Sequence, residues 1–161
     1  MIAIKRLLSV AVLVGLACAA TLAQAKDPLV GTWKLNPEKS KGGYKSGTSV
    51  FEAAGDGVKA TVDLVGTDGT AYHWTFTAKY DGKDNPTKPM LDGKPNPNAA
   101  DAVAYKKIDD FTYEATTKLK GKTLTVARHV ISKDGKTRTV TTTGTNAQGQ
   151  KVNDTTVFEK Q

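Results

Sequence analysis

Residues 72–80 read YHWTFTAKY, and this stretch decides the fold class. Large apolar side chains recur at every second position from Tyr72 to Tyr80, and the positions between them carry His73, Thr75, Thr77 and Lys79. Successive side chains of a strand point to opposite faces, so a period of two predicts a strand with one apolar face. Residues 111–119 and 124–131 alternate in the same way, whereas no segment has a convincing helical period. The sequence therefore predicts an all-β protein.

Turn signals divide the chain at regular intervals. They are Asp56-Gly57, Asp68-Gly69, Asp81-Gly82, Gly121, Asp134-Gly135 and Gln148-Gly149. Such pairs favour tight turns between antiparallel strands, and their spacing leaves room for one strand each time. We expect about eight to ten antiparallel strands, at 30–36, 47–54, 57–65, 69–80, 101–108, 111–120, 122–133, 136–145 and 148–160.

Composition supports closure of these strands into a barrel. Residues 26–161 contain 21 threonines and 11 valines against 6 leucines and 2 isoleucines. Branched side chains of this kind fit a pleated surface, and closing a long meander removes its exposed edges. We expect a single domain, residues 26–161, folded as an up-and-down, lipocalin-like β-barrel.

Residues 1–25 have the pattern of an export signal. Lys5 and Arg6 precede an apolar stretch of about 17 residues, too short for the roughly 20 of a spanning helix, and residues 23–25 form a small-x-small cleavage site. Cleavage there would leave Lys26 as the mature N-terminus and lower the formal charge from +7 to +5. We expect a periplasmic or extracellular protein with no transmembrane segment in its mature chain.

Cys18 is the only cysteine and lies inside this segment. Lipidation at Cys18 is disfavoured, because Gly15 stands where lipoprotein signals usually carry a large aliphatic residue. The mature chain would then contain neither a thiol nor a disulfide.

Two segments interrupt the strand pattern. Residues 81–100 contain four of the six prolines, which argues against a central strand there. Two interpretations stay open for this segment: a long surface loop, or a lid or lip across one mouth of the barrel. Residues 37–41 are compatible with one helical turn.

Motifs for catalysis, metal binding or cofactor binding are not recognisable in the sequence. His73 and His129 both fall opposite the apolar face of their strands and are expected at the solvent. We therefore expect no metal, no cofactor and no enzymatic activity. The lysines are scattered over turns and polar faces without an aromatic platform, so nucleic acid is not an expected partner.

Arg128 is the charged residue that stands out. It shares a face with Val126 and Val130, and an unpaired guanidinium on a buried face would be costly. Three explanations stay open: pairing with an internal acid such as Asp154, a strand that turns this face outward, or anchoring of a ligand carboxylate.

The ends of the mature chain carry a family resemblance. Residues 30–35 read VGTWKL, which resembles the Gly-x-Trp opening of the lipocalins and the first strand of the fatty-acid-binding proteins. Residues 157–160, VFEK, resemble the closing strand of the latter family, and residues 126–130, VARHV, resemble its late hairpin with an internal arginine. With GTWKLNP at 31–37 and KYDGKD at 79–84, the whole stretch is similar to small exported bacterial proteins described as lipocalin-like.

This resemblance implies an up-and-down barrel with Trp33 packed at its closed end and a lumen for a small apolar molecule. The chain departs from the fatty-acid-binding proteins where their closing strand grips a carboxylate with Arg-x-Tyr, because it has Thr156 and Phe158 there. Glycines also replace the helical portal that follows the first strand of that family.

The favoured hypothesis is a non-catalytic barrel that binds a small hydrophobic or amphipathic ligand. Its lumen would be lined by some of Tyr72, Trp74, Phe76, Tyr105, Tyr113, Arg128 and Phe158. The alternative is an exported interaction protein that inhibits a protease by inserting residues 26–29 as an N-terminal tail. The sequence leaves the oligomeric state open.

Overall fold

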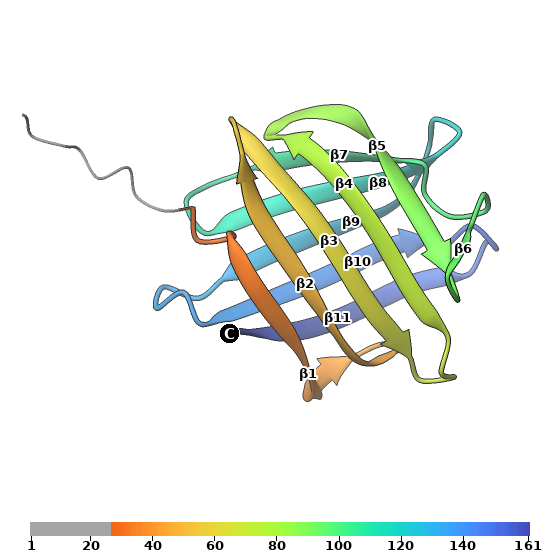
Figure 1. Cartoon of the computed structure of the whole chain (residues 1–161), viewed down its shortest axis with the longest axis horizontal. Helices are drawn as coiled ribbons and strands as arrows, with labels where there is room; N and C mark the ends of the chain where they lie inside the picture. Colours follow the sequence, from red (N-terminus) through yellow and green to blue (C-terminus); the bar gives the residue numbers. More distant parts are fainter. Residues whose placement is uncertain (1–26) are drawn as a thin grey trace, which may run out of the picture.

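The computed structural model describes residues 27–161, which form one antiparallel sheet rolled into a barrel (Figure 1). Its strands are β1 (Gly31–Lys41), β2 (Tyr44–Ala54), β3 (Gly57–Gly66), β4 (Ala71–Lys79), β5 (Asp81–Leu91), β6 (Lys94–Pro95), β7 (Ala102–Lys107), β8 (Thr112–Leu119), β9 (Lys122–Ile131), β10 (Thr137–Thr145) and β11 (Lys151–Lys160). Residues 1–26, which include the expected export signal and Cys18, lie outside the described residues.

A pairing between the first and the last strand closes the barrel, and a pairing between the consecutive strands β4 and β5 completes the ring. β1 pairs with β11, with Leu35 opposite Phe158, and β4 pairs with β5, with Trp74 opposite Pro89. The two-residue strand β6 pairs only with β5 and lies outside the ring, so ten strands form the wall. The expected all-β, up-and-down barrel is confirmed. Across residues 27–161, no helix is long and apolar enough to cross a membrane.

Nine strands lie where the alternation predicts them, but the helical turn expected at 37–41 is wrong. Those residues continue β1 through an irregularity in its pairing with β11, between Asn36 and Lys41. The Ser40 hydroxyl donates to the Asn36 carbonyl at 2.6 Å and accepts from the Val157 N–H at 2.9 Å. Ser40 thereby satisfies backbone groups that the register shift would leave unpaired.

The expectation that residues 81–100 hold no central strand is also wrong, because β5 runs between β4 and β7. Its first half pairs with β7 as far as Pro86, and its second half pairs with β4 from Thr87 onward. Pro86 pairs only with β7 and Pro89 pairs only with β4, so each proline has a strand partner on one side of β5 alone. A strand tolerates a residue without an N–H at such places, as it does at an edge.

The expected orientation of β9 is wrong as well. Tyr113 on β8 is fully buried, and its cross-strand partner on β9 is His129. Opposed residues of an antiparallel pair point to the same side, so His129 faces inward and its neighbour Arg128 faces the solvent. Arg128 lies opposite Glu114 on the outer surface.

Candidate functional site

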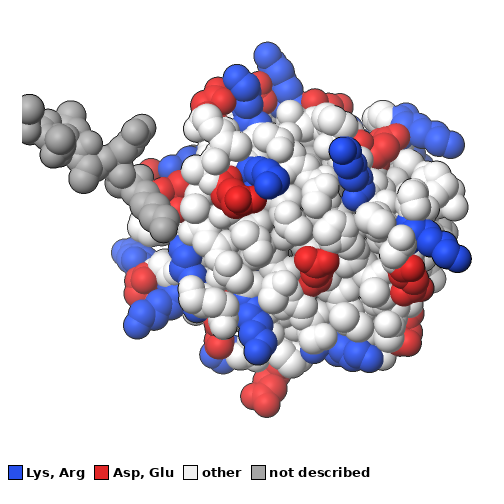
Figure 2. Space-filling model, in the orientation of Figure 1, with Lys and Arg blue, Asp and Glu red and all other residues white. Residues whose placement is uncertain are grey.

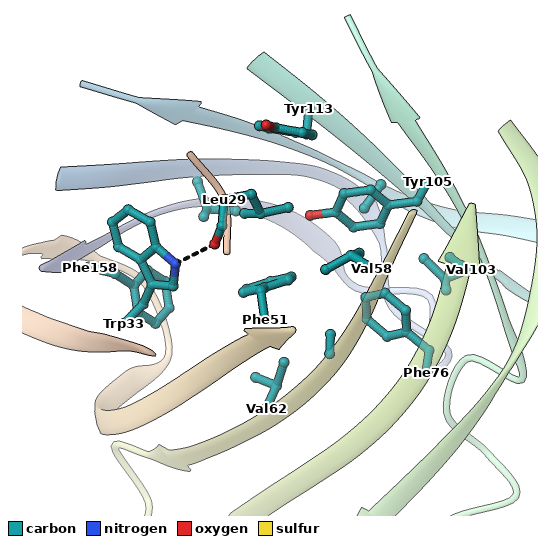
Figure 3. Close-up of a cluster of buried hydrophobic side chains, with 14 of the residues drawn as sticks. Leu29, Trp33, Phe51, Val58, Val62, Phe76, Val103, Tyr105, Tyr113 and Phe158 are labelled. Carbon is teal, nitrogen blue, oxygen red and sulfur yellow. Dashed lines mark hydrogen bonds between the residues drawn. The ribbon is translucent and has the colours of Figure 1, made fainter. Parts of the chain in front are cut away.

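A short N-terminal segment covers one end of the barrel. Residues 27–30, here called the cap, place Leu29 in the core with no exposed surface. The Trp33 Nε1–H donates to the Leu29 carbonyl at 2.8 Å (Figure 3). The Lys160 ammonium donates to the Pro28 carbonyl at 2.9 Å. Trp33 itself is fully buried at this closed end, as the resemblance implies.

Two tyrosines hold the cap through the Asp27 carboxylate. The Tyr80 hydroxyl donates to Asp27 Oδ2 at 2.7 Å, and the Tyr113 hydroxyl donates to Oδ1. Burial, followed by these bonds to Asp27, raises the pKa of both phenols. Both tyrosines therefore stay protonated and remain donors at neutral pH.

A buried arginine lies beneath the cap. The Arg138 guanidinium is 4.3 Å from the ring centroid of Phe158, 4.8 Å from that of Phe51 and 5.3 Å from that of Trp33. Its Nη2 donates to Ser49 Oγ, whereas its Nε has no hydrogen-bond partner among the described residues. Burial lowers the pKa of Arg138 to about 10, so the group remains charged at neutral pH. Three aromatic faces stabilise this cation in place of a carboxylate.

His129 lies beside Arg138 in the same packed half of the barrel. Its Nδ1 is 3.3 Å from the Tyr105 hydroxyl. Its ring meets Phe51 edge to face, with ring centroids 6.5 Å apart. Burial and the positive charge of Arg138 hold the pKa of His129 well below its ordinary value of 6.5. The imidazole is therefore neutral, and the expectation that it faces the solvent is wrong.

The opposite end of the barrel is hollow. A cavity of about 610 Å³, here called the hollow, opens between the loops at 42–43, 92–101 and 146–150. Its apolar and aromatic lining residues are Tyr44, Tyr72, Trp74, Phe76, Pro89, Met90, Leu91, Val103, Leu124 and Val152. Five threonines add hydroxyls: Thr87, Thr117, Thr125, Thr142 and Thr156. This volume lies within the range of pockets that hold drug-sized molecules.

Residues 81–100 contribute to the rim of the hollow. The second half of β5 and the segment after β6 line it with Met90, Leu91, Asn96, Asn98 and Ala99. Asn96 is held in place, because its N–H donates to the Pro89 carbonyl at 3.0 Å. Neither a surface loop nor a lid or lip across the mouth describes the whole segment, because residues 81–91 are strand β5 of the wall and the residues after β6 border the hollow.

Tyr44 and Asp154 lie together in the hollow. The Tyr44 ring meets Tyr72 edge to face, with centroids 5.7 Å apart and planes at 88°. Burial raises the pKa of Tyr44 to about 12, with further contributions from Tyr72 and from the charge of Asp154. Among residues 27–161, Asp154 is the only carboxylate that lines the hollow.

A second depression, of about 450 Å³, lies on the outside of the barrel along β1 and β11. Among its lining residues, Glu159 Oε1 accepts from Asn36 Nδ2 at 3.0 Å, and it also accepts from Lys39 Nζ at 2.9 Å. This groove is shallow and polar, so the hollow is the better candidate for a ligand site.

The structure divides the sequence-predicted lining residues between three places. Tyr72, Trp74 and Phe76 line the hollow. Tyr105, Tyr113 and Phe158 belong to the packed core of the closed half. The Tyr105 ring packs on the Phe76 ring, with ring centroids 5.7 Å apart. Arg128 is on the outer surface, so the outward-turned strand is the one of its three explanations that the structure supports, and its suggested place in the lumen lining is wrong. It does not pair with Asp154, which faces inward.

Sequence reasoning did not select Arg138 or Tyr44, and it named Asp154 only as a partner for Arg128. A signal was present in each strand: Arg138 shares its face with Val140, and Asp154 shares its face with Thr156 and Phe158. What was missing was the register between neighbouring strands, which determines the face that turns inward.

The sequence matches no protein-family model. It also matches no curated protein.

Proposed function

We propose that this protein is an exported, lipocalin-like barrel that binds a small hydrophobic or amphipathic molecule in the hollow, without catalysing a reaction. The observation that carries the proposal is the hollow itself: about 610 Å³ inside the barrel wall, lined mainly by apolar and aromatic side chains. Pockets of this size and lining are the usual sites of small-molecule binding. The closed half is filled by its own side chains, so the ligand would enter from the open end.

A binding role is favoured over catalysis by the chemistry of the lining. Acid–base catalysis needs a donor and an acceptor whose pKa values lie near the working pH. The Tyr44 phenol, with a pKa raised to about 12, is a poor proton shuttle beside Asp154. Among residues 27–161, no group of three or more histidine, cysteine or acidic side chains is arranged to hold a metal ion.

The alternative of an inhibitory N-terminal tail gains no support from residues 27–29. Leu29 is fully buried, and Asp27 is bonded to two tyrosines of the barrel wall. A tail that inserts into a protease must extend away from its own domain, whereas these residues are packed against or bonded to the barrel.

The binding proposal is tested by filling the hollow. Thr142 lines it, and the adjacent Thr141 points outward on the same strand. Thr142→Phe should weaken the binding of the neutral, environment-sensitive dye Nile red by at least about tenfold, measured by fluorescence titration. Thr141→Phe is the matched control and should bind as the wild type does. Equal binding by Thr142→Phe, with its fold intact by circular dichroism, would place the dye elsewhere and overturn the proposal.

Export is tested separately, because the signal lies outside the described residues. The intact mass of the protein recovered from the periplasm or medium should correspond to a chain that begins at Lys26. A full-length mass, or retention in the cytoplasm, would contradict export.

A further inference from the structure

Charge is distributed differently on the outside of the barrel and in the hollow. Basic and acidic side chains intermingle over the face in Figure 2, and several form ion pairs, such as Lys59 with Glu52 and Lys118 with Asp84. The hollow, in contrast, is lined by no lysine or arginine of the described residues. In a chain of net charge +7, the binding cavity therefore contains a carboxylate and no fixed positive charge.

The Asp154 carboxylate has no partner of its own. It lies opposite Thr142 near the start of β11, and no hydrogen bond or ion pair joins it to another described residue. Glycine at position 42 leaves room for it, since a Cβ there would come within 3.0 Å of Asp154 Cγ. A carboxylate that lines an otherwise uncharged cavity attracts the positively charged group of a ligand bound there.

Aromatic rings border the same part of the hollow. The Tyr44 ring interacts electrostatically with Asp154 and packs edge to face on Tyr72. Trp74, two residues after Tyr72 on β4, also lines the hollow. The faces of aromatic rings attract cations, and a carboxylate combined with tyrosine and tryptophan favours an ammonium group over an anion. Deeper in the hollow, Phe76 and Val103 offer apolar contacts without a charge.

We propose that the ligand of the hollow is an amphipathic cation, with an amine or quaternary ammonium group beside Asp154 and Tyr44 and an apolar part directed toward Phe76 and Val103. This inference rests on the proposed binding function and specifies its ligand class. It reverses the polarity expected from the sequence, in which Arg128 would hold a carboxylate. Arg128 is outside the barrel, and Arg138 is enclosed by aromatic rings in the closed half.

Three probes of equal chain length separate charge from apolar binding. Octyltrimethylammonium, octanoate and octanol share one apolar chain and differ in the charge of the head group. By isothermal titration calorimetry, the wild type should bind octyltrimethylammonium at least about tenfold more tightly than octanoate, with octanol between them.

The structure offers a charge-relocation variant as a control. Asp154→Asn removes the charge from the hollow, and the double variant Asn153→Asp/Asp154→Asn moves it to the outer face of β11 with the net charge unchanged, because Asn153 is exposed. Both variants should lose most of the preference for the cation and keep their affinity for octanol. Retention of the preference in the double variant would show that the cation does not depend on a carboxylate at position 154, and would overturn the inference.

The outcomes distinguish this inference from the function on which it rests. If octanol and octanoate bind as tightly as the cation, the hollow is a binding site but the ligand class is wrong. If none of the three probes binds to the wild type and Nile red also fails, the proposed function itself fails.

Discussion

The two ends of this barrel share one continuous wall and differ in what lies inside it. At the closed end, Trp33 is fully buried and its indole N–H is bonded to the cap. At the open end, Trp74 is partly exposed and borders the hollow. These are the only two tryptophans of the chain, so each end carries one.

The cap explains much of the difference. Residues 27–30 bring Leu29 and the Asp27 carboxylate into the closed end. Leu29 lies there with the rings of Trp33 and Phe51 (Figure 3), and Arg138 lies against both rings. At the open end, no described segment crosses the interior. Stability is therefore expected to depend on the closed end, whereas the open end can hold a ligand at little cost to folding.

The largest expected effect contrasts the two tryptophans. Trp33→Ala should lower the free energy of unfolding by about 3–5 kcal/mol, because it opens a cavity in a packed core and frees the Leu29 carbonyl. Trp74→Ala should cost less than about 1.5 kcal/mol, because it enlarges a cavity that already exists. Urea denaturation of both variants measures the difference, and equal losses would contradict the division into a packed end and a hollow end.

A smaller effect is expected at the buried cation. Ser49→Ala removes the one side-chain acceptor bonded to Arg138 and should cost about 2 kcal/mol of stability, since a hydrogen bond to a buried charge is lost. Ser46→Ala, on the same strand but exposed, should change stability by less than about 0.5 kcal/mol. If Ser49→Ala is equally mild, the aromatic rings alone are sufficient for Arg138.

The smallest effect is a pH dependence that contrasts the two histidines. The pKa of His129 is lowered in the folded state, so the unfolded chain takes up a proton below about pH 6.5 that the folded chain does not. The contribution of the neutral His129 imidazole to the free energy of unfolding should therefore be complete above pH 6.5. Below pH 6.5 the free energy of unfolding should fall by up to about 1.4 kcal/mol per pH unit. Thermal or urea unfolding between pH 7 and 5 measures this slope.

Two substitutions identify the source of the slope. His129→Gln should abolish it, whereas His73→Gln should retain it, because His73 lies on the outer face, 2.7 Å from Asp63. Carboxyl groups such as Asp109 and Asp134, whose pKa is lowered by hydrogen bonds, titrate below this window. A slope that persists in His129→Gln would refute a buried neutral imidazole at this position.

Local sequence patterns predicted much of the wall. The alternation from Tyr72 to Tyr80 and the Asp-Gly turns were sufficient to place nine strands, because side-chain direction and turn geometry are local properties. β5 was missed because a proline normally excludes a central strand, and only the pairing of its two halves with different neighbours removes that objection.

Prediction of the site was less complete. Tyr72, Trp74 and Phe76 were expected in the lumen and line the hollow, because their strand has one clearly apolar face. On β9 both faces carry apolar residues, and the more apolar one, with Val126 and Val130, does not face the core. Val130 is 43% exposed, so hydrophobicity alone selected the wrong face and with it the wrong arginine.

The sequence by itself determined that this chain forms antiparallel strands, roughly where they begin and end, and that Trp33 opens the first of them. Tertiary structure alone decided which face of β9 turns inward, that Arg138 is buried and that Asp154 lies in the hollow. The physical reason is that strand alternation depends on neighbours in the chain. Register and closure depend on partners as distant as Leu35 and Phe158, which come together only when the barrel forms.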